Sequence, residues 1–166
     1  MERRRMTDGE QYRQLLTQAY DGERLGVVLG RELAARTDDA GERAVYHAFE
    51  RVESVARAQL EPMIAAAGAA EDVLDEDAVE RQGADLAGQM AAQPRTVAWT
   101  GILPEFERFI GHLERLRDLA PAGDRRPYNV LVDHEVASVA MVRAVIDDDL
   151  VTAERVLRGF LDAATS

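Results

Sequence analysis

The amino-acid sequence predicts an all-α fold built around long amphipathic helices. Apolar residues recur at helical spacing over most of the chain, and no segment shows the alternation of a half-buried strand. Capping and helix-breaking residues also stand at the ends of the periodic segments. The 166 residues are enough for a single domain with its own core, and no domain boundary is apparent. We therefore expect one helical-bundle domain over residues 1–166.

The first helix is predicted to begin after Thr7, because Thr7 and Glu10 form the spacing of a capping box. Its apolar stripe continues to Leu33. Glu23 falls within this stripe and is expected to face inward; the alternative is that it lies at the edge and extends to solvent. Residues 22–30 contain two overlapping Gly-x-x-x-Gly patterns, which favour close helix packing or room for a ligand.

The second helix is predicted to follow the Asp38–Asp39 pair and to stop at Gly68. Pro62 should disturb its last turns. Glu53 lies beside the apolar stripe of this helix and is a second inward candidate. His47 is interpreted as a partly exposed surface residue rather than a ligand.

An acidic loop and a shorter helix, capped by Asp77, are predicted to connect the second helix to the next long one. The following long helix spans about Arg95–Leu119 and is interrupted by Pro104. Glu107 fits its inward face. An equally weighted alternative places Glu107 on a solvated face of paired charges.

The last long helix is predicted over Asn129–Ile146, after a proline-containing loop. Its spacing brings His134, Glu135 and Ser138 onto or beside the inward face. An imidazole and a carboxylate there require polar partners from other helices. After Asp147–Asp149, either this helix bends and continues or a further helix packs back across the bundle.

Composition excludes several classes of function. The net charge of −11 disfavours nucleic-acid binding, since phosphates require a basic surface. All twenty basic residues are arginine, so a lysine Schiff base is excluded, and the absence of cysteine excludes thiolate chemistry. No phosphate-binding loop, nucleophile elbow or dinucleotide fingerprint occurs. No apolar run is long enough for a membrane span, and Met1–Met6 is not followed by the apolar segment of a signal peptide. We therefore expect a cytoplasmic protein that binds neither nucleic acid nor membrane.

One glutamate lies near the middle of each long helix: Glu23, Glu53, Glu107 and Glu135. In this arrangement, the chain from about Thr7 to Ile146 resembles the ferritin-like superfamily. The run Leu131–Ala137 also resembles the last helix of a group of bacterial ferritin-like proteins. The resemblance implies a four-helix bundle with a long crossover that carries a short helix, and with a C-terminal extra or continued helix.

Dinuclear members of that superfamily use one glutamate from each of two helices and a Glu-x-x-His pair from each of the other two. This sequence departs from the pattern, because Ala56 and Ser138 occupy the two histidine positions. We therefore expect no cofactor. The alternative is an oxidase or oxygenase that binds iron or manganese through Glu23, Glu53, Glu107, His134 and Glu135.

The favoured hypothesis is a carboxylate-lined internal pocket that binds a mostly apolar small molecule. Buried carboxyls have a raised pKa and can exchange protons near neutral pH, as in a cyclisation, isomerisation or dehydration. The catalytic candidates are Glu135, His134, Glu53 and Glu23. The candidates for contacting a bound molecule are Tyr20, Tyr128 and Trp99.

A third hypothesis is a structural or interaction protein without catalysis. In that case the inward carboxylates would form ion pairs with arginines such as Arg24, Arg57 or Arg143. A homodimer is expected, and the segment Val151–Leu161 is a candidate contact surface.

Overall fold

The computed structural model describes residues 6–164, and in this range it contains six helices and no strand. The all-α prediction is therefore confirmed; residues 1–5, on which most of the prediction for Met1–Met6 falls, lie outside the described residues. The helices are α1 (Asp8–Arg36), α2 (Ala40–Ala66), α3 (Glu76–Ala91), α4 (Arg95–Leu119), α5 (Arg126–Ile146) and α6 (Leu150–Ala164).

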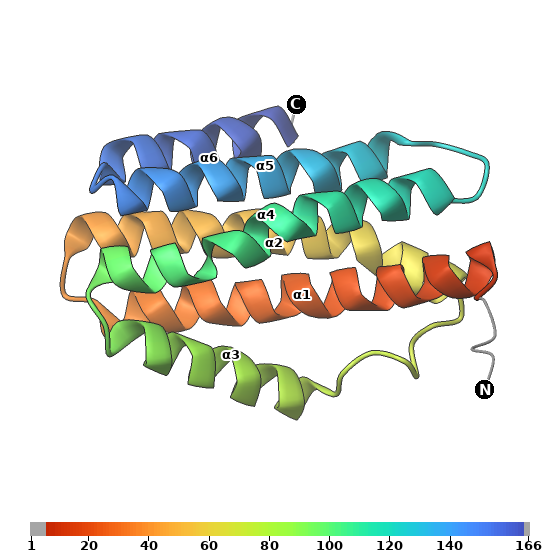
Figure 1. Cartoon of the computed structure of the whole chain (residues 1–166), viewed down its shortest axis with the longest axis horizontal. Coiled ribbons are helices and arrows are strands. Elements are labelled where there is room, and N and C mark those ends of the chain that lie inside the picture. Colours follow the sequence, from red (N-terminus) through yellow and green to blue (C-terminus); the bar gives the residue numbers. More distant parts are fainter. Residues whose placement is uncertain (1–5, 165–166) are drawn as a thin grey trace.

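The four long helices α1, α2, α4 and α5 run side by side along the length of the molecule (Figure 1). The shorter α3 packs against α1 and lies on the connection between α2 and α4. The C-terminal α6 packs against α5 and α2. Of the two alternatives for the C-terminal segment, the separate helix that packs back is confirmed.

Most predicted helix ends are confirmed by their caps. The Thr7 hydroxyl accepts a hydrogen bond from the Glu10 amide at 3.2 Å, and the Glu10 carboxylate accepts one from the Thr7 amide at 2.8 Å. Asp39 caps α2, and Gly68 beyond its end has a φ of +59°, a backbone conformation that favours glycine. Two predicted starts were wrong. Asp75 rather than Asp77 caps α3, and α5 begins at Arg126, before the predicted Asn129, because a proline is accepted in a first helical turn.

The glycines of α1 permit close contact with its neighbours. A Cβ atom added at Gly30 would lie 2.9 Å from the backbone nitrogen of Glu50 in α2, nearer than real Cβ atoms approach other atoms. At Gly26 it would overlap a carboxylate oxygen of Glu53. The prediction of close helix packing from the Gly-x-x-x-Gly patterns is confirmed.

The apolar core is divided into two clusters. One contains Leu29, Phe49 and Trp99, and the other contains Leu16 and Leu60. The positions between these clusters on α1 and α2 belong to buried polar residues. The bundle therefore has an apolar core on either side of a polar middle.

Arg95, at the start of α4, connects this helix to α2 and to the α5–α6 turn through ion pairs. It forms ion pairs with Glu42 near the start of α2 and with Asp148 in the α5–α6 turn. Asp148 has a φ of +61°, the left-handed conformation that reverses the chain before α6. None of the described helices combines the length and apolar character needed to cross a membrane.

Candidate functional site

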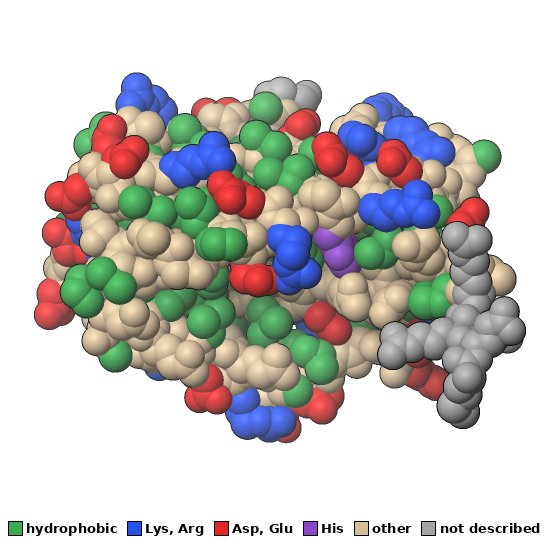
Figure 2. Space-filling view, viewed as in Figure 1, with side chains coloured by type: hydrophobic (Ala, Val, Ile, Leu, Met, Phe, Trp, Pro, Cys, Tyr) green, Lys and Arg blue, Asp and Glu red, His purple; other side chains and the backbone are tan. Residues whose placement is uncertain are grey.

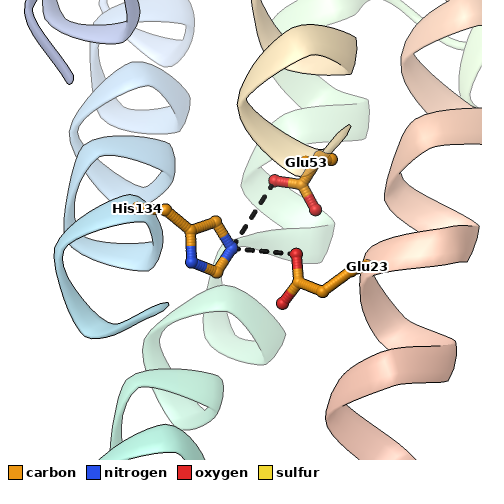
Figure 3. Close-up of side chains that lie close together, drawn as sticks. All are labelled: Glu23, Glu53 and His134. Atoms are coloured by element: carbon orange, nitrogen blue, oxygen red, sulfur yellow. Dashed lines mark ion pairs between the residues drawn. The ribbon is translucent and has the colours of Figure 1, made fainter. Parts of the chain in front are cut away.

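Buried polar side chains from three helices meet in the middle of the bundle (Figure 3). Glu23 comes from α1, Glu53 from α2, and His134 and Glu135 from α5, and each is at most 5% exposed. The Nε2 atom of His134 lies 2.9 Å from Oε2 of Glu23, 3.9 Å from Oε1 of Glu53 and 3.5 Å from Oε2 of Glu135. The prediction that all four face inward is confirmed, and we call them the carboxylate cluster.

Hydrogen bonding sets the tautomer of His134. Its Nδ1 atom bonds to the backbone carbonyl oxygen of Leu131, one turn earlier in α5. A carbonyl oxygen only accepts hydrogen bonds, so Nδ1 must carry the proton. In the neutral ring Nε2 is then an acceptor, and it faces carboxylate oxygens that are acceptors too. A proton or another cation is needed between them.

Several acceptors of the cluster lack a donor. Within the described residues, neither oxygen of Glu23 nor Nε2 of His134 has a hydrogen-bond partner of acceptable geometry. The 2.9 Å separation of Glu23 Oε2 and His134 Nε2 therefore brings together two atoms that can bond only through a proton carried by one of them. Glu53 is better satisfied, since the Ser138 hydroxyl donates to its Oε1 at 3.3 Å.

Burial dominates the electrostatics of the three glutamates. Loss of hydration raises the pKa of Glu23 from its ordinary value of 4.5 to about 8, although its interaction with the Glu53 carboxyl opposes this rise. Burial, with repulsion from neighbouring carboxylates, also raises the pKa of Glu53 and of Glu135 well above the ordinary value. The cluster therefore retains protons at neutral pH.

The arginines expected to neutralise these carboxylates pair elsewhere. Arg24 binds Asp21 and Glu76 with the Leu74 carbonyl, on the side of α1 that faces the α2–α3 connection. Arg57 pairs with Glu61, and Arg143 pairs with Glu107. No ion pair joins an arginine to the cluster in residues 6–164, so the ion-pair interpretation of the buried glutamates receives no support.

A cavity of about 460 Å³ opens onto the cluster. Its base is formed by Glu23, Glu53 and Glu135. Its walls are mainly apolar and come from α1, α2, α3 and α4: Gly22, Leu25, Gly26, Leu29, Phe49, Leu86, Ile102, Phe106 and Phe109. The exposed Glu105 and Arg108, which pair with each other, also line it. On the surface shown in Figure 2, apolar side chains gather between α3 and α4, among acidic and basic groups.

The middle of α4 forms one wall of the cavity without filling the space beneath it. Between Trp99 and Leu113 no residue of α4 is fully buried, whereas both of these residues are. Pro104 lies in this stretch and cannot donate a backbone hydrogen bond to the preceding turn. The helix is thus anchored at its two ends and loosely packed where it covers the cavity.

Four other predicted site residues lie outside this site. Of the two equally weighted interpretations of Glu107, the solvated face is correct, because Glu107 is exposed and pairs with Arg143 at 2.7 Å. The Tyr128 hydroxyl bonds to that of Tyr12 at 2.8 Å within the other apolar cluster. Tyr20 packs against Arg24, and Trp99 against Tyr46. None of these four lines the cavity.

Sequence reasoning missed the aromatic wall. Phe106 and Phe109 are apolar positions of α4, and the helical period alone does not distinguish residues that line a cavity from residues of a packed core. The glycine pattern of α1 contained the missing signal, because a Cβ atom at Gly22 would lie 3.0 Å from the ring of Phe109. Phe109 in turn stacks on His112, whose Nε2 bonds to the Leu15 carbonyl at 2.8 Å.

The residues present do not fit a dinuclear metal centre. Such a centre takes ligands from four helices, including two histidines. Here α4 supplies no ligand, since Glu107 is exposed, and the two histidine positions hold the buried Ala56 and Ser138. Donor atoms of Glu23, Glu53 and His134 do lie within 4.8 Å of one another, which is a donor set for one ion at most.

Comparison with known proteins identifies no relative. No family model, no curated protein and no solved structure matches the chain. The function of the protein must therefore be inferred from the chemistry of the cavity and its carboxylates.

Proposed function

We propose that this chain is a ferritin-like bundle that binds a mostly apolar small molecule in the cavity and exchanges protons with its polar end. The observation that carries the proposal is a single cavity whose walls are apolar and whose base consists of three buried carboxyls. A volume of about 460 Å³ is in the range of small-molecule sites. Ligand sites of this kind combine apolar walls with a few converging polar groups.

The arrangement of the helices supports the ferritin-like assignment. Four long helices lie side by side, and the connection from α2 to α4 carries the short α3 (Figure 1). Inward glutamates come from α1, α2 and α5, as the superfamily pattern implies. The small Ala56 and Ser138 take up less space than the histidines of that pattern.

The cluster contains the parts required for proton transfer. A protonated carboxyl facing the cavity can donate its proton to the ligand, and a neighbouring ionised carboxyl can accept one from another position of the ligand. The protein then ends with the same number of protons, as a double-bond isomerisation requires. His134 lies behind the glutamates and does not line the cavity. It therefore acts on Glu23 rather than on the ligand and is a positioning residue.

A blocked cavity tests the binding proposal. Ile102 lines the cavity and is only partly buried, so Ile102→Trp fills the space without disturbing a packed core. Val97→Trp is the matched control, because Val97 is 53% exposed on the same helix and outside the cavity. We expect the neutral apolar dye Nile red to bind the parent and Val97→Trp with increased fluorescence, and Ile102→Trp to lose this response. Equal responses of all three proteins would overturn the proposal.

Metal analysis distinguishes the proposal from the oxidase or oxygenase alternative. Protein purified without chelator and without a metal-binding tag is analysed for iron and manganese. The proposal predicts far less than one equivalent, and dye binding that is unchanged by EDTA. Stoichiometric metal, lost in Glu53→Gln and retained in the exposed control Glu107→Gln, would contradict metal-independent chemistry.

A further inference from the structure

The donor and acceptor balance of the cavity identifies the polar group of its ligand. We propose that the ligand carries a primary ammonium group on an apolar body, with the ammonium N–H groups directed at Glu23, Glu53 and Glu135. This inference rests on the proposed function, since it assigns the chemical class of the molecule in the same cavity.

The first argument is hydrogen-bond satisfaction. Glu23, Glu53 and Glu135 line the cavity, and within the described residues no group outside the cluster donates a hydrogen bond to either oxygen of Glu23. The one side-chain hydroxyl that donates to the cluster, that of Ser138, bonds to Glu53. Buried acceptors without donors are costly. A primary ammonium is donor-only and offers three N–H groups, whereas an alcohol offers one O–H.

The second argument is charge. Three carboxyls face the cavity, and no arginine in residues 6–164 forms an ion pair with any of them. The nearest arginine along α1, Arg24, is directed away from the cluster toward Glu76. A carboxylate or phosphate ligand would find no cation to pair with among these groups, whereas a cation would replace a proton of the cluster and take its position.

The third argument is the composition of the walls. Three of the lining side chains are phenylalanines, Phe49, Phe106 and Phe109, and Phe49 and Phe106 have ring centroids 6.0 Å apart. Aromatic faces favour a nearby cation and also pack against an apolar chain. The charged pair Glu105–Arg108 lies among the exposed lining residues, so the apolar surface ends where solvent begins.

Calorimetric titration with four probes of equal chain length tests the inference. The probes are octylamine, octanol, octanoate and octyltrimethylammonium, titrated at pH 7 into protein treated with EDTA. Octylamine is expected to bind roughly tenfold or more tightly than octanol, because a charge-assisted hydrogen bond replaces a neutral one. Octyltrimethylammonium has the charge but no N–H donor and is expected to bind more weakly than octylamine. Octanoate is expected not to bind.

A carboxamide variant locates the recognition. Glu23→Gln keeps the shape of the side chain but cannot give up a proton to become negatively charged, so it should abolish the preference for octylamine over octanol. Glu107→Gln, outside the cavity, should leave the preference unchanged. Should Glu23→Gln fail to fold, as judged by circular dichroism, Glu135→Gln serves the same purpose at a second carboxyl of the base. An unchanged preference in a folded variant would overturn the inference.

Different results would overturn the ammonium inference and the proposed function. If Nile red and octanol bind but octylamine is not preferred, the ammonium inference is overturned while the apolar pocket remains. If no probe binds the parent and Ile102→Trp changes nothing, the proposed function itself is overturned.

Discussion

Substitution of Glu23 by glutamine should change how stability depends on pH. Burial raises the pKa of the Glu23 carboxyl from 4.5 to about 8 in the folded protein. The unfolded chain, in which the carboxyl is hydrated, ionises near the ordinary value. The folded state therefore holds a proton that the unfolded state releases between these two pH values. The contribution of Glu23 is fully present below about pH 4.5 and is lost as the pH rises toward 8.

The size of the effect follows from the same two values. One pH unit corresponds to 1.36 kcal/mol, so the rise of the Glu23 pKa from 4.5 to about 8 amounts to about 5 kcal/mol. Glutamine is neutral at every pH and has no such dependence. The free energy of unfolding of Glu23→Gln minus that of the parent should therefore increase by about 3 to 5 kcal/mol between pH 4.5 and pH 8. The lower figure allows Glu53 and Glu135 to take up part of the charge.

Urea denaturation at half-unit pH steps, in the presence of EDTA, measures this difference. Glu107→Gln is the control, because an exposed ion pair contributes about 1 kcal/mol or less and should show no comparable trend. A difference that stays constant across the pH range would refute the reasoning. It would mean that Glu23 is already ionised in the folded protein and neutralised by an imidazolium or another cation.

Four further substitutions follow from the packing and the ion pairs. Gly30→Ala should destabilise the protein by about 2 kcal/mol in urea denaturation, because the added methyl group meets the backbone of α2. A Cβ atom added at Gly88 has no neighbour within 4 Å, so Gly88→Ala should stabilise the protein by up to about 1 kcal/mol. Gly26→Ala should displace the Glu53 carboxyl at the cavity. The free energy of Nile red binding should therefore change more than the free energy of unfolding, and unchanged binding would contradict the position of Glu53. Arg95→Met should lower stability by about 1 to 2 kcal/mol in urea denaturation, since two carboxylates lose their partner, and unchanged stability would contradict this role.

The helices and their inward faces could be predicted because both depend on local sequence. Thr7 and Asp39 cap helices through neighbours three residues away, and the apolar period of each helix places Glu23 and Glu53 inside. The errors were local as well. The start of α3 was displaced by two residues because the acidic loop offers several capping aspartates.

Glu107 shows where the periodic pattern fails. The nearby Phe106 and Phe109 occupy the inward side of α4, where they are partly buried. In the middle of this helix no residue is fully buried. Period alone cannot decide which side of a loosely packed helix faces the bundle, since the choice depends on what the other helices offer.

The all-α fold, the helix ends to within a few residues, and the burial of Glu23, Glu53, His134 and Glu135 can be predicted from the sequence, because they follow from contacts along one helix. The packing of the helices against one another brings these side chains together, directs the arginines away from them and leaves a cavity beneath α4. Those features depend on how close the helices approach one another. That distance is set by glycines such as Gly26 and Gly30 meeting side chains far away in the sequence.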